Sequence, residues 1–228
     1  MSANRKFLLG LVALVIVAAA IFVGVREISK STTTTSSTSS TSSTSLLPST
    51  WMAVWPTATS SPYATPAAAA RTFAIHVLQM KHPILEPYRA GDSRSGELPI
   101  RATSTGPETT VLVRQLADDN SWWVLGASTA AIDITHPAAL STVHSPFELS
   151  GRSTAFEAVV NVTLRGDGLV APLVETTVMG GANGVMGPFH TTLHFTSPSS
   201  HYGTLVLYTR SAKDGSVTEA SVIRVKFA

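Results

Sequence analysis

The stretch AVVNVTLRGDG, residues 158–168, decides the class of fold. Every second residue from Ala158 to Leu164 is apolar, and the polar Asn161 stands among the residues between them. A period of two residues is typical of a strand that buries one face in a core. The glycine-rich Gly166-Asp167-Gly168 follows directly and predicts a hairpin turn. We therefore expect a β-rich fold around this strand.

Six further strand-like runs surround this strand. They span residues 130–134, 147–151, 173–178, 189–195, 205–207 and 223–227. Seven short strands separated by turn residues are typical of an immunoglobulin-like arrangement of two packed sheets. The pattern therefore predicts an all-β, immunoglobulin-like sandwich over residues 131–228.

Several pieces of this region also resemble a known family. They are Ile134–Pro137, Ser145–Gly151, Ala155–Ala158, Gly187–Phe195 and Ser211–Ser216. In order and spacing they are similar to the immunoglobulin-like domain of bacterial spore germination, over about residues 132–227. The turn at 138–141 lacks the glycine that the resemblance leads us to expect. The resemblance implies an extracytoplasmic, non-catalytic module that contacts the cell wall or partner proteins.

The preceding residues, 64–130, predict a small α+β domain with one helix on an antiparallel sheet. Thr65-Pro66 is typical of a helix start, because threonine caps the helix and proline fits its first turn. The helix is expected over 67–80, where apolar residues recur at helical spacing.

Three strands are expected after this helix, at 97–103, 109–116 and 121–127. The turn residues 118–120 join the last two strands into a predicted hairpin. Apolar residues fall on both faces of the run 109–116, which predicts a strand that is covered on both sides.

The N-terminal part of the chain has the composition of a membrane anchor joined to a stalk. Phe7 to Val25 carry no charge, and Ser31 to Ser45 are all serine or threonine. An apolar helix over 7–25 would be about 28 Å long, close to the hydrocarbon thickness of a bilayer. We predict a cytoplasmic N-terminus (1–6), a transmembrane anchor in the lipid bilayer (7–25), and a disordered Ser/Thr/Pro-rich stalk (26–63). The stalk favours extracellular C-terminal domains, and the alternative is a protein secreted after signal cleavage.

Charge and cysteine content exclude several classes of function. The first thirty residues hold four Lys or Arg and one Glu, whereas the rest hold twelve against thirteen Asp and Glu. A nucleic-acid partner requires a basic stripe, which this distribution does not provide. The chain has no cysteine, which excludes disulfides and thiolate chemistry. No hydrolase, zinc-protease or phosphate-loop motif occurs in the sequence, so we expect no catalytic residues, no cofactor and no metal.

Two neighbouring tryptophans are candidates for a binding surface. Trp122 and Trp123 must point to opposite faces of their strand, so one is expected to pack on the helix. An exposed ring beside Arg101 or Arg114 would form a platform for a ligand. The alternative is that both rings are covered by the core.

Gly181 and Asn183 are the second candidate surface. They lie in the glycine-rich run 180–184, between two predicted strands and with no helix after it. Phosphate-binding loops need a helix N-terminus or an equivalent nest of amides. We therefore interpret this run as a mobile loop that forms a contact surface.

Other polar residues are expected to be structural. His190 and His194 lie about 13 Å apart on one strand, too far for one metal ion, and are expected to face solvent. Glu157 follows Phe156, which we place in the core. It is expected to form an ion pair or a turn-capping hydrogen bond, with Lys213 or Arg210 near the turn at 214–215 as partner.

We therefore expect a non-catalytic, membrane-tethered binding or scaffold protein of the bacterial cell envelope, whose partner is a cell-wall polymer or an envelope protein. One alternative is an accessory or regulatory subunit of a membrane-proximal enzyme or transporter. A more distant alternative is a cell-wall glycan hydrolase, which would need paired carboxylates in a cleft.

Overall fold

The structure, a computed structural model, describes residues 50–57, 63–116 and 120–228. The predicted anchor at 7–25 and most of the predicted stalk lie outside these ranges. Among the described residues, no helix is long and apolar enough to cross a membrane. The described residues all fall within one compact unit, Thr44–Ala228.

Helix α1 (Pro66–His76) begins where the sequence predicts. The Thr65 hydroxyl accepts a hydrogen bond from the Ala68 N–H at 3.2 Å, so threonine caps the first turn as expected. Phe73 and Ala70 lie on the predicted apolar face and are fully buried.

The helix ends earlier than the predicted residue 80. Gln79 has a φ of 60°, in the left-handed region, and the Met80 N–H donates to the Ala74 carbonyl at 2.9 Å. The chain therefore leaves the helix while Leu78 and Met80 are still buried. Their apolar character reflects core packing rather than continuation of the helix.

The predicted antiparallel sheet consists of β3 (Ser95–Arg101), β4 (Glu108–Gln115) and β5 (Trp122–Thr129). The hairpin between β4 and β5 is confirmed by their antiparallel pairing, and residues 117–119 of its turn lie outside the described residues.

Strand β4 is covered on one face only, so the prediction of a strand covered on both sides is wrong. Val111 and Val113 are buried against α1, whereas Leu112 between them is 39% exposed. Leucine on the outer face of a sheet is ordinary, because folded proteins leave much apolar surface exposed.

The predicted sandwich forms in the C-terminal part of the chain. Its main strands are β6 (Ile132–His136), β8 (Phe147–Ala155), β9 (Val159–Gly166), β10 (Val174–Met179), β12 (Gly187–Leu193), β13 (Tyr202–Arg210) and β14 (Val217–Phe227). Shorter elements are η1 (Thr50–Met52), β1 (Ile84–Leu85), β2 (Arg89–Ala90), β7 (Thr142–Val143), η2 (Phe156–Ala158) and β11 (Gly181–Ala182). One layer contains β6, β8 and β12, and the facing layer contains β10, β9, β13 and β14.

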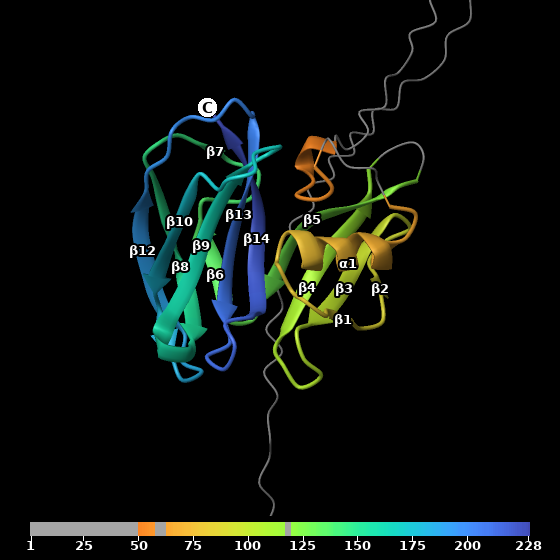
Figure 1. Cartoon of the computed structure of the whole chain (residues 1–228). Coiled ribbons are helices and arrows are strands. Elements are labelled where there is room, and N and C mark those ends of the chain that lie inside the picture. Colours follow the sequence, from red (N-terminus) through yellow and green to blue (C-terminus); the bar gives the residue numbers. More distant parts are fainter. Residues whose placement is uncertain (1–49, 58–62, 117–119) are drawn as a thin grey trace, which may run out of the picture. The chain divides into compact units, whose positions relative to one another are not determined.

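One sheet runs through both predicted parts of the chain (Figure 1), in the order β1-β3-β4-β5-β14-β13-β9-β10. Its junction is the antiparallel contact of β5 with β14, in register at Ala127 and Val222. The α+β part and the sandwich are therefore joined edge to edge by one sheet.

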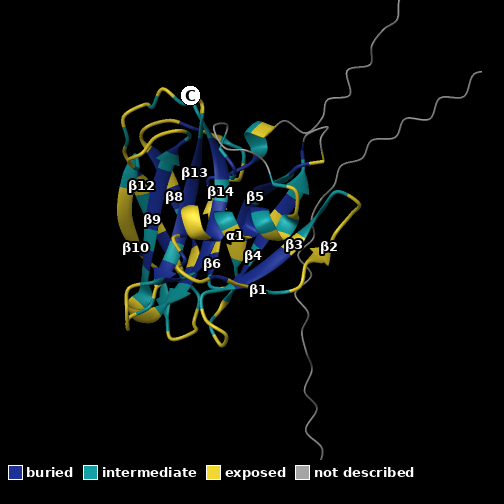
Figure 2. Ribbon diagram, turned by 45° about the vertical axis from the view of Figure 1, so that its right-hand side comes forward, coloured by how far each residue is buried: buried dark blue, intermediate teal, exposed yellow. Residues whose placement is uncertain are grey.

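Two apolar cores lie on opposite faces of this sheet. The first lies under α1 and includes Phe73, Ile100 and Val222, and the second lies between the sandwich layers and includes Leu149 and Leu205. Figure 2 shows the burial as dark blue along β13 and β14. Alternate residues of these two strands enter different cores, so both faces of each strand are covered.

Residues 50–57 are packed on the sheet, although the sequence places them in the stalk. Val54 is buried, and Trp55 pairs with Val124 of β5 through backbone hydrogen bonds. The folded part therefore begins before the predicted boundary at 64, because the apolar side chains of this segment cover β5.

The buried Arg224 side chain ties this N-terminal segment to the sandwich. Its guanidinium donates to the Trp51 carbonyl at 2.8 Å and to both carboxylate oxygens of Asp167, one of them at 2.6 Å. The Trp51 ring stacks on Tyr202 at 5.3 Å. The Arg224 carbonyl accepts from Leu140, whose φ of 66° fills the turn position where the sequence lacks the expected glycine.

We expect Arg224→Ala to lower the free energy of unfolding by about 3 kcal/mol, because removing one partner of a buried ion pair leaves the other unpaired. Urea unfolding of the full-length chain, followed by circular dichroism, measures this loss. Arg71→Ala removes an exposed arginine from α1 and should change stability by less than about 0.5 kcal/mol. An equal effect of the two variants would contradict the role of Arg224.

Candidate functional site

A strip of polar residues lies on the outer face of the sandwich layer that contains β10, β9 and β13. On β9, Val160 and Val162 enter the sandwich core, so Asn161, Thr163 and Arg165 point the other way. Glu175 of β10 lies in register with Thr163 and adds a carboxylate to this face.

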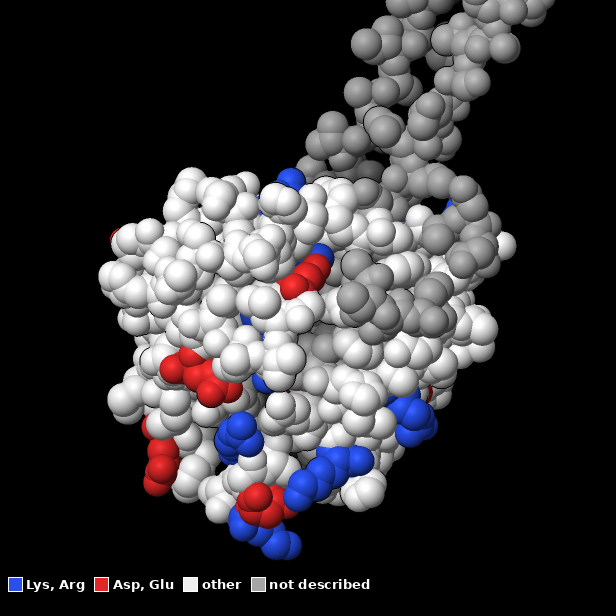
Figure 3. Space-filling model, turned by 45° about the horizontal axis from the view of Figure 1, so that its top comes forward, with Lys and Arg blue, Asp and Glu red and all other residues white. Residues whose placement is uncertain are grey.

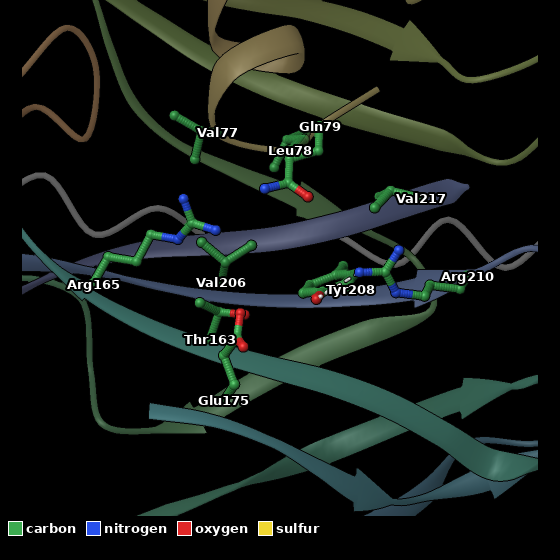
Figure 4. A pocket seen from close by; sticks show the side chains of 10 residues that line it. All are labelled: Val77, Leu78, Gln79, Thr163, Arg165, Glu175, Val206, Tyr208, Arg210 and Val217. Carbon is green, nitrogen blue, oxygen red and sulfur yellow. Dashed lines mark hydrogen bonds between the residues drawn. The ribbon is translucent and has the colours of Figure 1, made fainter. Parts of the chain in front are cut away.

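The end of α1 covers part of this strip and turns it into a groove. Three hollows with shared lining residues follow one another along β9. Figure 4 shows the middle hollow, where Val77, Leu78 and Gln79 stand opposite the strand residues. Its lining consists of Val77, Leu78, Gln79, Thr163, Arg165, Glu175, Val206, Tyr208, Arg210 and Val217.

The two arginines of the middle hollow differ in how they are held. The Arg210 guanidinium donates to the Gly215 carbonyl and to the Tyr208 hydroxyl, and it lies 5.0 Å from the centre of the Tyr208 ring. Arg165 is partly buried, and no described residue forms an ion pair or a hydrogen bond with its guanidinium. Arg165 is therefore available to bind an anionic or hydrogen-bond-accepting group.

An aromatic residue marks one end of the groove. Trp55 and His76 stack at 5.5 Å, and the Trp55 indole N–H donates to the Thr72 hydroxyl at 3.1 Å. These contacts fix the ring beside a hollow of about 240 Å³. At the other end, a more open hollow of about 390 Å³ lies over Asn161 and Thr176.

The chemistry of the groove fits the recognition of an extended polar chain. The amide of Gln79 and the hydroxyl of Thr163 can exchange hydrogen bonds with hydroxyl or amide groups. The guanidinium of Arg165 can bind a carboxylate or phosphate with two parallel hydrogen bonds. On the face drawn in Figure 3, blue Lys and Arg lie among red Asp and Glu rather than in a continuous stripe.

The two predicted tryptophans point to opposite faces, but neither forms an open platform. Trp122 packs against the core under α1 and meets Tyr88 edge to face at 5.8 Å. Trp123 is 8% exposed and packs with Ala53 and Leu116. The N-terminal segment covers Trp123, so of the two alternatives the structure supports covered rings rather than an exposed platform.

Gly181 and Asn183 lie at a defined β-turn, in which the Val185 N–H donates to the Ala182 carbonyl at 2.9 Å. Gly181 belongs to β11, and a β-carbon there would lie 1.9 Å from the Val185 carbonyl oxygen. Asn183 and Gly184 both have positive φ, as two-residue hairpin turns require. Asn183 is exposed, so its surface is open to contact. The structure does not bring this turn together with the tryptophans, which lie toward the other end of β5.

The FEA segment differs from its predicted role. Phe156 is 66% exposed, so its assignment to the core is wrong. Glu157 has a φ of 55° and forms no ion pair with a described residue, because the chain bends through η2 and turns its side chain outward. His190 and His194 are exposed, as predicted.

Sequence reasoning missed the groove itself. The alternation in 158–165 places Asn161, Thr163 and Arg165 on the face opposite the apolar residues, and such a face is ordinarily assigned to solvent. The groove arises because α1 and the Trp55 segment lie beside that face, and this proximity depends on the pairing of β5 with β14. The polar run on β9 was a signal, but its partner elements are distant in sequence.

Comparison of the chain with known proteins gives a match to one family model and to no individual protein. No curated protein and no solved structure matches the chain. The matched segment of the family model ends at residue 216, immediately before β14, so it includes β9 and β13 of the groove. Residues 131–216 match the model of the immunoglobulin-like domain of bacterial spore germination, which confirms the resemblance found in the sequence.

Proposed function

We propose that this chain is a non-catalytic, membrane-tethered binding protein of the bacterial cell envelope, and that its groove holds a polymer of the cell wall. The immunoglobulin-like domain supports a binding role, because such sandwiches commonly act as binding modules. The apolar run Phe7–Val25 and the Ser/Thr tract Ser31–Ser45 support a tethered, extracytoplasmic position.

The unpaired Arg165 carries the proposal for the groove. An arginine that forms an ion pair with no described residue, in a hollow that Gln79 and Thr163 also line, is suited to a carboxylate or phosphate on a hydroxyl-rich chain. The hollows on either side extend the contact along β9, which suits a polymer better than a compact metabolite.

The carboxylates at the groove favour binding over hydrolysis. Glu175 lies in the middle hollow, whereas Asp167 at the Trp55 end is engaged by Arg224. Glycoside hydrolysis uses two carboxyl groups on either side of one scissile bond. Asp167 is paired with Arg224 and is therefore not free to act as the second carboxyl group.

Arg165→Gln should weaken retention of the full-length chain on purified cell wall by about tenfold or more, because a hydrogen bond to a charged group contributes about 1.5–3 kcal/mol. A pull-down with increasing amounts of wall, quantified by immunoblot, gives the apparent affinity. The matched control, Arg71→Gln, also removes one arginine, which is exposed on α1 and lies outside the groove.

Retention that is unchanged in Arg165→Gln, or reduced equally in Arg71→Gln, would argue against the groove as the wall-binding site. A wild-type chain that does not bind wall at all would argue against the proposed ligand.

The membrane tether is tested separately. The full-length chain should stay with membranes after alkaline carbonate extraction, and deletion of residues 1–30 should release it, because the apolar run provides the insertion energy. Protease added to intact cells should reach residues 64–228. Residues 64–228 that survive inside the cells, or a mature chain found free in the medium, would contradict the tethered extracellular topology.

A second candidate function is that of an accessory subunit that contacts an enzyme or transporter. The specific observation in its favour is a group of exposed apolar side chains at one end of the sandwich, Phe156, Met179 and Val185. Exposed apolar patches often mark protein contacts.

A further inference from the structure

An open, surface-facing cavity of about 460 Å³ lies at the end of the sandwich where β14 begins. It lies at the opposite end of β14 from Arg224, and it is bounded by the turn between β5 and β6 and by the turn that follows β11. Its lining is largely apolar and includes Ala131, Met186 and Gly184. The polar groups in this apolar lining therefore determine which ligand it can hold.

The main polar group in this cavity is the carboxyl of Glu219. Glu219 is 9% exposed and accepts hydrogen bonds from the hydroxyls of Thr129 and Thr209. No described residue places a cation within ion-pair distance of it. Burial raises the pKa of Glu219, because the ionised form loses hydration that two threonines only partly replace. A positive charge entering the cavity would compensate this carboxylate.

The other polar residues of the lining do not provide a second open site for a positive charge. Glu108 also lines the cavity, but it is paired with Arg101 at 2.9 Å. Thr154 also lines the cavity, but its hydroxyl oxygen is buried and closed to an entering group. Glu219 is therefore the carboxylate of the lining that no described cation pairs with.

Exposed apolar side chains lie at the same end of the molecule. Val185, Met179 and Phe156 are 70%, 68% and 66% exposed. Their segments meet because β11 pairs with the end of β8 and the Gly180 N–H donates to the Ala158 carbonyl. Val185 stands between Gly184 and Met186 of the cavity lining, so a partner that fills the cavity would meet an exposed apolar side chain beside it.

We propose that this end of the sandwich binds a partner protein through a lysine side chain, with the ammonium group on Glu219 and apolar neighbours of the lysine against Val185. The largely apolar lining suits the methylene stem of lysine, and the buried carboxylate suits its charge. An anionic membrane surface would be repelled by Glu219. This inference goes beyond the wall-binding groove and stands independently of it.

The test uses hexylammonium as the probe of an alkyl cation and hexan-1-ol as its neutral counterpart. Methyl NMR of the full-length chain labelled at methionine reports the site, because Met186 lines the cavity and Met80 is buried elsewhere as a reference. Hexylammonium should shift the Met186 signal with at least about tenfold higher affinity than hexan-1-ol, because only the cation pairs with Glu219.

Glu219→Gln should abolish this preference, whereas Glu148→Gln, which removes an exposed carboxylate on β8, should preserve it. Equal binding of the two probes in the wild type would overturn the proposal. Loss of the preference in Glu148→Gln, or a shift of Met80 instead of Met186, would overturn it as well. Tighter binding of butane-1,4-diammonium than of hexylammonium would overturn the lysine assignment and indicate a soluble polyamine.

Glu219→Gln is expected to fold, which keeps the test decisive. Because the folded pKa of Glu219 is raised, the carboxyl favours folding when it is protonated, and this contribution is lost as the pH rises through the folded pKa. The glutamine variant should therefore be at least as stable as the wild type at pH 7, and the difference should shrink in acid. Urea midpoints across pH measure this, and a less stable variant at pH 7 would contradict an uncompensated carboxylate.

Discussion

The fold depends on two strands that are covered on both faces. Along β13 and β14, successive side chains enter different cores, with Val206 and Val222 under α1 and Leu205 and Val225 inside the sandwich. Apolar side chains on both faces of a strand require a covering layer on each side. The helix is one layer, the β6–β8–β12 sheet is the other, and the pairing of β14 with β5 connects them.

This arrangement explains where the binding surfaces lie. The groove forms where α1 stops covering the outer face of the sandwich sheet, so its walls belong to elements fixed by the same two strands. A site held in one geometry by packed elements loses little conformational entropy when its ligand binds. The Glu219 cavity lies near the start of β14, and the Arg224 contacts with Trp51 and Asp167 lie near its end. The two ends of β14 therefore differ in chemistry, with a buried carboxyl group near its start and a buried arginine near its end.

Local signals predicted what depends on neighbours in sequence. Thr65-Pro66 gave the helix start because a cap and a first-turn proline act within four residues, and the alternation in 158–165 gave β9 because a sheet face repeats every two residues. Tertiary contacts determined the rest. Leu78 and Met80 continue an apolar pattern that serves the core beyond the helix, and Trp123 is covered by a segment that composition assigns to the stalk. The uninterrupted apolar run Leu205-Val206-Leu207 indicates a strand that is buried on both faces. The neighbouring sequence does not indicate which element covers the second face. For the same reason the groove and the Glu219 cavity, which combine residues far apart in the chain, could not be predicted.

One sheet joins the helix-bearing part to the sandwich, so the two parts should unfold together and hold the walls of the groove in place. Native-state hydrogen exchange of the full-length chain across a urea series measures this, since it gives the opening free energy of each amide. We expect protected amides in β4 and β5 to open with the same free energy and urea dependence as those in β9 and β13. Opening of β3, β4 and β5 at a clearly lower free energy, while β8, β9 and β13 stay closed, would contradict it.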